Sequence, residues 1–489
     1  MFSKNKIKKI LLIHPPGNRV VKADGERGLK AAVPPLGLAY LASALQIKGY
    51  EVVILDCIAE GYNDPELELE PEIYRYGLGD GKIAAFIKDI DPDIVGISCP
   101  QTVRQLEANN VALISKKALP DVPVVMGGAS PSALRESLMS HDSIDFIVQG
   151  EGEERFCHLL DALQNHNDDL KKVDGLIYRS GKSVIVNRLS NIIRKIDLIS
   201  MPAYDLLPMD KYSKIRKNPA ISSESTNSTI MISSRGCAMK CYYCPVHNVF
   251  GTAGPSFRMR AIENVLMEIE LLVSRYGIEE IQFEDANFNA SPARTIALSE
   301  AIAKRFPDLK WCSPHGNQLS TLNDEVLEAM REGGCHSLYL AIESGNQAFL
   351  DNRKKSVRLD NLDHVLKSSR ELGFKVNSFF MIGYPEEKKA DIQNTISYAK
   401  SLDIDDAHFF IATPFPGTDM YDICKKDGLI DVDLSWRHFR YSLGVISTEY
   451  FDPAYLQKVR RDAWLEMFVK KAGIEKQMST GSMELDIYG

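Results

Sequence analysis

The sequence predicts an α/β protein with two successive parallel-sheet domains and a short helical extension. Three observations predict this class: short apolar runs alternate with helical patterns, apolar residues make up 44% of the 489 residues, and charged residues make up 25%. Buried runs that alternate with helices are typical of parallel sheets, because the helical crossovers cover both faces of the sheet. The length leaves room for about three domains.

The first domain, residues 1–165, is predicted to be a doubly wound, Rossmann-like sheet. Its expected helices are 36–48, which ends at Gly49, and 81–90, which ends before Pro92. Its expected strands are five short apolar runs at 10–13, 52–55, 94–98, 122–126 and 146–148.

Residues 166–228 are predicted to be a linker, since Pro, Ser and Asn are frequent after Ser200. The segment contains a short hairpin around Gly181, with expected strands at 176–178 and 184–186.

The second domain, 229–435, repeats the alternation and is predicted to be a full or partial (β/α) barrel. The extension at 436–489 contains an expected helix at 453–471 and a polar end that we expect to be disordered. The expected strands of the barrel are 230–233, 281–283, 337–341, 376–381 and 407–411.

Charge and hydropathy exclude some classes of protein. With 58 Lys plus Arg against 66 Asp plus Glu, the formal charge is −8, which argues against a nucleic-acid partner. Apolar runs such as 10–13 fall far below the roughly 18 residues that span a bilayer, so no membrane span is expected. The basic N-terminus lacks the apolar core of a signal peptide, and a cytoplasmic location is expected.

Three of the nine cysteines, Cys237, Cys241 and Cys244, form a C-x3-C-x2-C cluster directly after an expected strand. Thiolates at this spacing on a loop converge on three corners of an iron–sulfur cube and leave the fourth iron without a cysteine. A zinc site completed by His247, or chance clustering, are the alternatives that spacing alone leaves open. The other six cysteines stand singly, as buried thiols usually do.

The cysteine loop resembles the signature of the radical S-adenosylmethionine (SAM) superfamily, with Tyr243 as the aromatic residue before the last cysteine. This resemblance implies a 4Fe-4S cluster on Cys237, Cys241 and Cys244 whose open iron chelates SAM. Reductive cleavage of SAM to a 5′-deoxyadenosyl radical in a dry barrel would follow. A small-molecule substrate and an external electron donor such as flavodoxin or ferredoxin are also implied.

Further segments resemble family landmarks in the expected order along the barrel. Singly each is a turn or helix-cap signal, but together they fall at the carboxyl ends of successive strands, where barrel active sites lie. The last of them is the Pro-x-Pro-Gly-Thr segment at 414–418. The residues that this resemblance assigns to SAM are Tyr243, Glu284, Asp285, Glu343, Ser344, Gly383 and Pro385. Asn377, a polar residue on the strand before Gly383, is a further candidate, and a solvated strand end is the alternative for it.

The loops after the strands of the first domain are rich in glycine. Glycines at strand ends let the backbone approach a flat ligand or a phosphate closely, although any one of them also makes a tight turn. Together these loops resemble the cobalamin-binding domain that precedes many radical SAM enzymes, over about 1–160. The residues that this resemblance assigns to cobalamin are Pro35, Leu36, Gly37, Ser98, Gly127, Gly128, Ser130, Glu151 and Gly152.

One departure concerns the cobalt ligand. Many cobalamin domains carry Asp-x-His-x-x-Gly, whose histidine ligates cobalt, and this chain keeps His14 and Gly17 but lacks the aspartate that would orient the imidazole. We therefore expect His14 not to ligate cobalt. Cys99 lies in a ligand-facing loop, where a thiol could face cobalamin or substrate. Arg258 and Arg260 are expected at a solvated helix entrance, and binding of a phosphate or carboxylate group is the alternative for them.

The leading hypothesis is a cobalamin-dependent radical SAM methyltransferase that acts on an unactivated carbon or phosphorus centre of a small molecule. A cobalamin-dependent radical cyclase or rearrangement enzyme without net methylation is the first alternative. A nonenzymatic iron–sulfur redox sensor is the second, and it is disfavoured because a pure sensor has no need of ligand motifs at four strand ends. A zinc-binding interaction module is the third.

Overall fold

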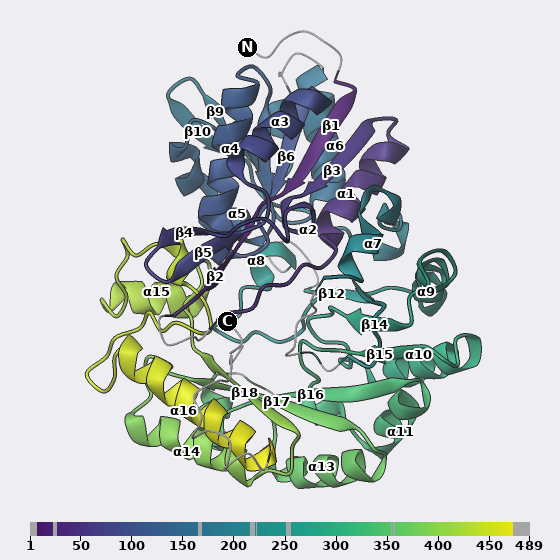
Figure 1. Ribbon diagram of the computed structural model, residues 1–489, viewed down its shortest axis with the longest axis vertical. Helices are drawn as coiled ribbons and strands as arrows, with labels where there is room; N and C mark the ends of the chain where they lie inside the picture. The colour runs from purple at the N-terminus through teal and green to yellow at the C-terminus, as the bar shows by residue number, and fades with distance from the viewer. Residues whose placement is uncertain are drawn as a thin grey trace. The chain divides into compact units, whose positions relative to one another are not determined.

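The computed structural model describes residues 7–22, 27–164, 169–215, 221, 223–250, 256–353, 355 and 357–472, with side chains up to 467 (Figure 1). The predicted disordered end beyond 472 lies outside the described residues. The chain divides into two compact units, and each is described by itself. Unit 1 comprises 1–23, 28–218 and 245–258, and unit 2 comprises 24–27, 219–244 and 259–489.

Unit 1 contains a seven-stranded sheet with the order β10-β9-β8-β7-β6-β1-β3. Its five strands β3, β1, β6, β7 and β8 are parallel, which confirms the predicted doubly wound fold. Ile10–Ile13 is fully buried, as expected of a strand covered on both faces. The strands are β1 (Lys9–His14), β3 (Glu51–Asp56), β6 (Ile94–Ser98), β7 (Val124–Gly127), β8 (Phe146–Val148), β9 (Leu176–Ser180) and β10 (Ser183–Val186).

Helices cover both faces of this sheet. α1 packs with α6 on one side, and α3 packs with α4 on the other (Figure 1). The predicted helices at 36–48 and 81–90 are confirmed as α1 and α3. The helices of unit 1 are α1 (Leu36–Ile47), α2 (Cys57–Glu60), α3 (Asp80–Ile90), α4 (Gln105–Ala118), α5 (Ala129–Leu134), α6 (Gly152–Gln164), α7 (Met209–Tyr212) and α8 (His247–Phe250).

The hairpin at β9 and β10 forms as predicted, but it is not part of a linker. β9 pairs antiparallel with β8 and so extends the main sheet of unit 1. Leu176 and Ile177 are fully buried there, which explains why the hairpin docks instead of standing alone. The structure thereby corrects the expectation of a linker at 166–228, because most of this segment belongs to unit 1.

A small antiparallel sheet with the order β2-β5-β4 was not predicted. Its strands have four residues each, and polar or charged residues interrupt every one, so they lack the continuous apolar runs that predict buried strands. They are β2 (Gly17–Val20), β4 (Leu67–Glu70) and β5 (Ile73–Tyr76).

Unit 2 contains a six-stranded parallel sheet in simple chain order, β11-β14-β15-β16-β17-β18. Consecutive parallel strands joined by helices are the construction of a (β/α) barrel, and six of them make the predicted partial barrel. The strand β15 was not predicted, because its apolar signal is only two residues, Trp311 and Cys312. The strands are β11 (Ser228–Met231), β14 (Glu280–Phe283), β15 (Lys310–Cys312), β16 (Cys335–Glu343), β17 (Lys375–Ile382) and β18 (Asp406–Ile411).

The predicted C-terminal helix is confirmed as α16 (Pro453–Ala472), which packs on β18, the last strand of the sheet. Arg460 donates from Nε to the Phe409 carbonyl at 2.9 Å, so the helix covers an edge that would otherwise stay open. Within the described residues, no helix has the length and apolarity needed to cross a membrane. The other helices of unit 2 are α9 (Ile262–Tyr276), α10 (Pro292–Arg305), α11 (Asp324–Glu332), α12 (Gln347–Asn352), α13 (Leu362–Glu371), α14 (Lys389–Ser401) and α15 (Asp419–Lys426).

Candidate active site

The three clustered cysteines lie on a loop between the short strands β12 (Ser234–Gly236) and β13 (Phe257–Met259). Cys237 is buried, Cys241 and Cys244 are half-buried, and all three thiols are free. The loop is tightly wound, since the Cys244 amide donates to the Cys241 carbonyl at 3.1 Å. The Met239 amide donates to Cys237 Sγ at 3.4 Å, and such a bond stabilises sulfur charge. A tightly wound loop with an amide directed at a cysteine sulfur suits a cluster held by three thiolates.

The Asp285 carboxylate accepts hydrogen bonds from the residues that lead into this loop. Its carboxylate accepts from the Ser233 amide and hydroxyl, both at 2.9 Å, and from the Ser234 hydroxyl. Burial raises the pKa of Asp285, and the serine donors oppose that rise. Three bonds to the protein thus occupy Asp285, which the sequence assigned to SAM. Its neighbour Glu284 pairs with the imidazole of His315, and it is the more exposed carboxylate of the two.

Glu343 lies at the end of β16 and pairs with Lys355. Its φ of 71° is in the left-handed region, and strained backbone of this kind clusters at functional sites. Lys355 Nζ lies 2.8 Å from Glu343 Oε1. Burial alone would lower the pKa of Lys355, but the Glu343 carboxylate and the sulfurs of Cys241 and Cys244 raise it. A half-buried ammonium therefore lies beside the cysteine cluster, and no motif in the sequence indicates it.

An aromatic cluster packs the loop after β17 against the cysteine loop. Tyr243 contacts Tyr384 edge-on at 5.6 Å between ring centroids, and Tyr242 stacks on Tyr384 at 6.1 Å. The Arg353 guanidinium lies 4.8 Å from the centroid of the Tyr384 ring, where it gains cation–π attraction. Burial raises the pKa of Tyr243, so its hydroxyl stays neutral. These rings exclude water from one side of the cysteine loop.

The predicted SAM residues after β16 and β17 are placed differently from one another. Ser344 is buried and its hydroxyl lies 3.2 Å from that of Thr395, while Asn377 donates to the Leu338 carbonyl at 3.4 Å. Both side chains are thus used inside the protein. Gly383, with a φ of 84°, allows close contact, since a Cβ there would lie 2.7 Å from Leu456. Pro385 is half-buried.

Glu387 shapes the Gly383 loop. Its Oε2 accepts from the amides of Gly383 and Tyr384 at 2.7 and 2.9 Å. Burial raises the pKa of Glu387 from 4.5 to about 8 although these amides oppose the rise. Between about pH 4.5 and pH 8, Glu387 is therefore protonated in the folded protein and ionised in the unfolded chain.

We expect the free energy of unfolding of unit 2 to fall as the pH rises from about 4.5 to about 8, by up to about 1.4 kcal/mol per pH unit from this group. The contribution is complete below the unfolded pKa and is lost as the pH rises through the folded pKa. Glu387→Gln keeps an oxygen for both amides and should remove this slope, as urea unfolding at several pH values would show. The exposed Glu371→Gln variant is the control, and a slope unchanged by Glu387→Gln would contradict the assignment.

In unit 1 the predicted cobalamin residues lie at the carboxyl edge of the sheet. β1 is flanked by β3 and β6, so the parallel strands run in the order 2-1-3-4-5, and ligands of such folds bind where this order reverses. Ser98, at the end of β6, is paired in register with Gly127, at the end of β7. A Cβ on Gly37 would meet nothing within 4 Å, and on Gly127 only the Val148 carbonyl at 3.5 Å. This open backbone suits a flat corrin ring.

Other residues assigned to cobalamin are held by the protein. Gly128 has a φ of 109°, and a Cβ there would lie 2.7 Å from the Cys99 carbonyl, so this glycine serves the turn. The Ser130 hydroxyl is buried and donates to Gln105 Oε1 at 2.7 Å. Leu36 is buried in α1, after the half-buried Pro35. Gly152 begins α6, where a Cβ would first meet Leu41 at 3.9 Å.

The aspartate missing from the histidine motif is replaced from another strand. His14 Nδ1 lies 3.1 Å from the Asp56 carboxylate at the end of β3, and His14 Nε2 lies 3.1 Å from Arg104. Asp56 also accepts from the Tyr212 hydroxyl at 2.7 Å. Both imidazole nitrogens thus have partners within the protein, and the expectation that His14 does not ligate cobalt stays a prediction. Cys99 is fully buried, and burial raises the pKa of its thiol to about 12, so it is not reactive.

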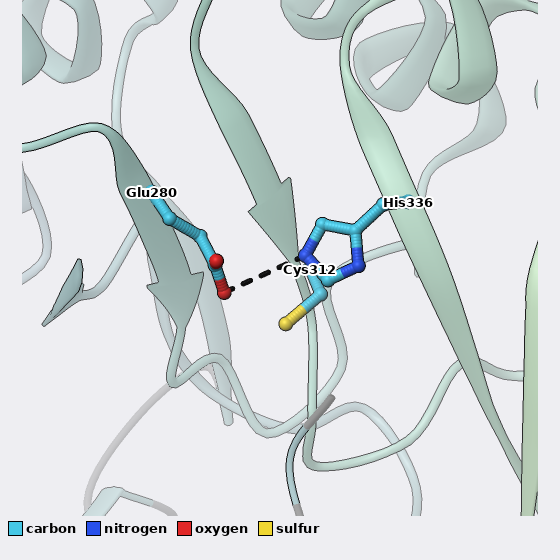
Figure 2. A group of neighbouring side chains, drawn as sticks. All are labelled: Glu280, Cys312 and His336. Atoms are coloured by element: carbon cyan, nitrogen blue, oxygen red, sulfur yellow. Dashed lines mark ion pairs between the residues drawn. The ribbon is translucent and has the colours of Figure 1, made fainter. Parts of the chain in front are cut away.

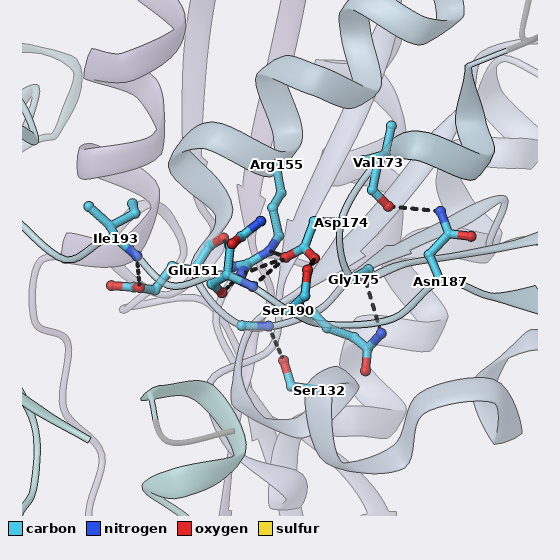
Figure 3. Close-up of polar contacts among 12 residues, drawn as sticks. Ser132, Glu151, Arg155, Val173, Asp174, Gly175, Asn187, Ser190 and Ile193 are labelled. Carbon is cyan, nitrogen blue, oxygen red and sulfur yellow. Dashed lines mark hydrogen bonds and ion pairs between the residues drawn. The ribbon is translucent and has the colours of Figure 1, made fainter. Parts of the chain in front are cut away.

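Glu151 and Arg258 form a buried ion pair. Arg258 Nη1 lies 2.9 Å and 3.1 Å from the two carboxylate oxygens, and the Ile193 amide donates to Glu151 Oε2 at 3.2 Å. Figure 3 shows Glu151 next to Arg155, which pairs with Asp174. Burial of Arg258 corrects the expectation of a solvated helix entrance. Arg260 is likewise buried and pairs with Glu268 at 2.5 Å. Arg258 and Arg260 thus each form a buried ion pair, and Glu151, which was assigned to cobalamin, is the partner of Arg258.

Comparison with known proteins identifies both units. The family model of the B12 binding domain matches residues 28–160, and that of the Radical SAM superfamily matches 231–399. An uncharacterized methyltransferase from Pyrococcus horikoshii is 34% identical over 466 residues, which cover 95% of this chain and 93% of the relative. Cytidylyl-2-hydroxyethylphosphonate methyltransferase from Streptomyces wedmorensis is 30% identical over 472 residues, which cover 90% of this chain and 86% of the relative.

A solved structure shares the fold. The radical SAM methyltransferase TsrM from Kitasatospora setae, with cobalamin and a 4Fe-4S cluster bound, has a TM-score of 0.67 and 18% identity. The match covers 93% of this chain and 85% of that chain. The relatives at 30% and 34% identity are both methyltransferases by name, which argues against the zinc module and the sensor. The chain belongs to the radical SAM enzymes with an N-terminal B12-binding domain, whose cofactors are a 4Fe-4S cluster, SAM and cobalamin.

Proposed function

We propose that this enzyme transfers a methyl group to an unactivated carbon or phosphorus centre of a small molecule. The observation that carries the proposal is the pair of relatives above, both methyltransferases by name, whose similarity spans at least 90% of this chain. When bound, the cluster and SAM supply a 5′-deoxyadenosyl radical that takes a hydrogen atom from the substrate, and cobalamin supplies the methyl group.

The residues of this chain bind and orient these groups. Cys237, Cys241 and Cys244 provide three thiolates, and the ammonium of Lys355 balances part of their charge. Because Lys355 lies at the C-terminal end of β16 together with Glu343, the pair can face the amino and carboxylate groups of SAM. In unit 1, the open backbone at Gly37 and Gly127 supports the corrin ring.

The partners follow from this chemistry. A radical SAM enzyme needs a small-molecule substrate and a one-electron reductant, and we infer that the reductant is a flavodoxin or a ferredoxin. A reducing compartment, the cytoplasm, suits nine cysteines that are all free thiols.

The test of the function needs no knowledge of the substrate. Protein purified anaerobically with iron, sulfide and cobalamin is reduced and mixed with SAM, and 5′-deoxyadenosine and S-adenosylhomocysteine are measured. Both products are expected, since a methyltransferase consumes SAM once for the radical and once to remethylate cobalamin. Deoxyadenosine without S-adenosylhomocysteine would favour the cyclase or rearrangement enzyme. Neither product from protein with a full cluster would overturn the proposal.

Lys355→Met is expected to raise the Kd of SAM by about 10- to 100-fold while the cluster iron stays unchanged, because the ammonium supports a charged ligand. The measurement is the change that SAM causes in the electron paramagnetic resonance spectrum of the reduced cluster. Lys367→Met, which replaces an exposed lysine, is the matched control. Lys355→Arg should restore part of the affinity, and an unaltered Kd in Lys355→Met would refute this role.

A further inference from the structure

Three potential metal ligands gather on neighbouring strands of unit 2. Figure 2 shows Glu280 of β14, Cys312 of β15 and His336 of β16 facing one another. Their donor atoms all lie within 4.8 Å of each other, and each residue is at most 1% exposed. Glu280 begins β14, whose other end leads to Asp285 and the cysteine loop. The group therefore lies toward the base of the sheet, away from the cluster.

In the described part of the chain, hydrogen bonds engage one polar side-chain atom of Glu280 and one of His336, and the two remaining atoms form an ion pair only if His336 is protonated. Glu280 Oε2 accepts from the Ser223 hydroxyl and from the amides of Glu224 and Ser225, at 2.7–2.8 Å. His336 Nδ1 lies 2.7 Å from the Ser337 hydroxyl. Among the described residues, neither Glu280 Oε1 nor His336 Nε2 makes a hydrogen bond, and the two atoms face each other at 3.5 Å.

The 3.5 Å between Glu280 Oε1 and His336 Nε2 suits a metal ion better than a hydrogen bond. It exceeds the 2.7–3.2 Å range of an N–H···O hydrogen bond. A tetrahedral zinc ion with bonds of about 2.0–2.1 Å to nitrogen and oxygen holds those two ligand atoms about 3.3 Å apart. If His336 Nδ1 donates to Ser337, the lone pair of Nε2 points at a carboxylate oxygen. Two buried lone pairs repel each other unless a cation lies between them.

The third potential ligand atom, Cys312 Sγ, favours a metal ion over a shared proton. A proton shared between Glu280 and His336 requires no thiol, whereas Cys312 brings its sulfur to the same point. One imidazole nitrogen, one thiolate and one carboxylate form a mixed donor set that suits zinc. The charges also balance, because a divalent ion is neutralised by one thiolate and one carboxylate.

We propose that Glu280, Cys312 and His336 bind one divalent zinc ion that fixes the segment 223–225 to the base of the sheet. The thiol of Cys312 releases its proton to solvent when the ion binds, and no electron is transferred. The three side chains leave the fourth position of the tetrahedron to a water molecule. Because Glu280 Oε2 stays bonded to Ser223, Glu224 and Ser225, the ion strengthens a connection that the protein already makes.

The experiment uses the full chain, purified anaerobically from medium that contains zinc and with its cluster reconstituted. Elemental analysis measures zinc and iron separately, and about one zinc per chain is expected in addition to the cluster iron. Zinc K-edge absorption, which iron and cobalt do not disturb, should show a single sulfur at about 2.3 Å and the remaining ligands at about 2.0–2.1 Å. Zinc below about a tenth per chain would overturn the proposal and leave a proton-bridged Glu280–His336 pair.

Variants confirm the position of the ion. Cys312→Ser and His336→Gln should each lower the zinc content at least about 10-fold and leave the cluster iron in place. Cys424→Ser removes another fully buried thiol and is the matched control, which should keep its zinc. Zinc that persists in Cys312→Ser, or absorption that shows three sulfurs, would place the ion on Cys237, Cys241 and Cys244 and refute the site. If the variants do not fold, the absorption spectrum of the unmodified chain decides.

Discussion

Replacing Cys241 with alanine is expected to reduce both the 4Fe-4S content and the formation of 5′-deoxyadenosine to background. The loop supplies three thiolates to a cube of four irons, and SAM needs the fourth iron. A cluster that loses one of its three cysteines has two open irons. The measurement is iron and sulfide per chain after reconstitution, together with the products from SAM.

A control separates loss of the cluster from loss of the fold. Cys157→Ala removes a single buried thiol from α6 of unit 1, and it should keep both the iron and the activity. Cobalamin binding by Cys241→Ala should also persist, because unit 1 has its own core. A full 4Fe-4S cluster in Cys241→Ala would show that the ligand set is wrong.

Local patterns were sufficient to predict the architecture. A buried parallel strand is a short apolar run, and the runs at 10–13, 94–98 and 376–381 became β1, β6 and β17. The cysteine spacing was equally local, since three ligands within eight residues can be read directly from the chain. Strands that are short or highly charged, such as β4 and β15, carry no such pattern and were missed.

Polar partnerships across long stretches of sequence were not predictable. His14 is oriented by Asp56, which is 42 residues away in the sequence and therefore lies outside the Asp-x-His-x-x-Gly motif. Lys355 joins Glu343 across 12 residues outside any motif, and only the folded structure brings it to the cysteine loop. A side chain in a ligand-type loop can likewise be engaged in hydrogen bonds within the protein, as those of Asp285 and Ser130 are. Motifs locate an edge of a sheet, but they do not tell which side chains there remain available.

Glu151→Ala is expected to lower the free energy of unfolding of unit 1 by about 3–5 kcal/mol, because it leaves the Arg258 guanidinium buried without its counterion. The exposed Glu154→Ala, three residues further along the chain in α6, should change it by less than about 0.5 kcal/mol. The measurement is hydrogen exchange of the amides of unit 1, followed by mass spectrometry with and without cobalamin.

The double variant Glu151→Leu/Arg258→Met distinguishes an ion pair from a cobalamin contact. Apolar side chains of similar volume often replace a buried ion pair without loss of stability, so the double variant should recover most of the loss. If Glu151 acts on cobalamin instead, Glu151→Ala would weaken cobalamin binding and leave the stability of the free protein unchanged, and the double variant would restore nothing.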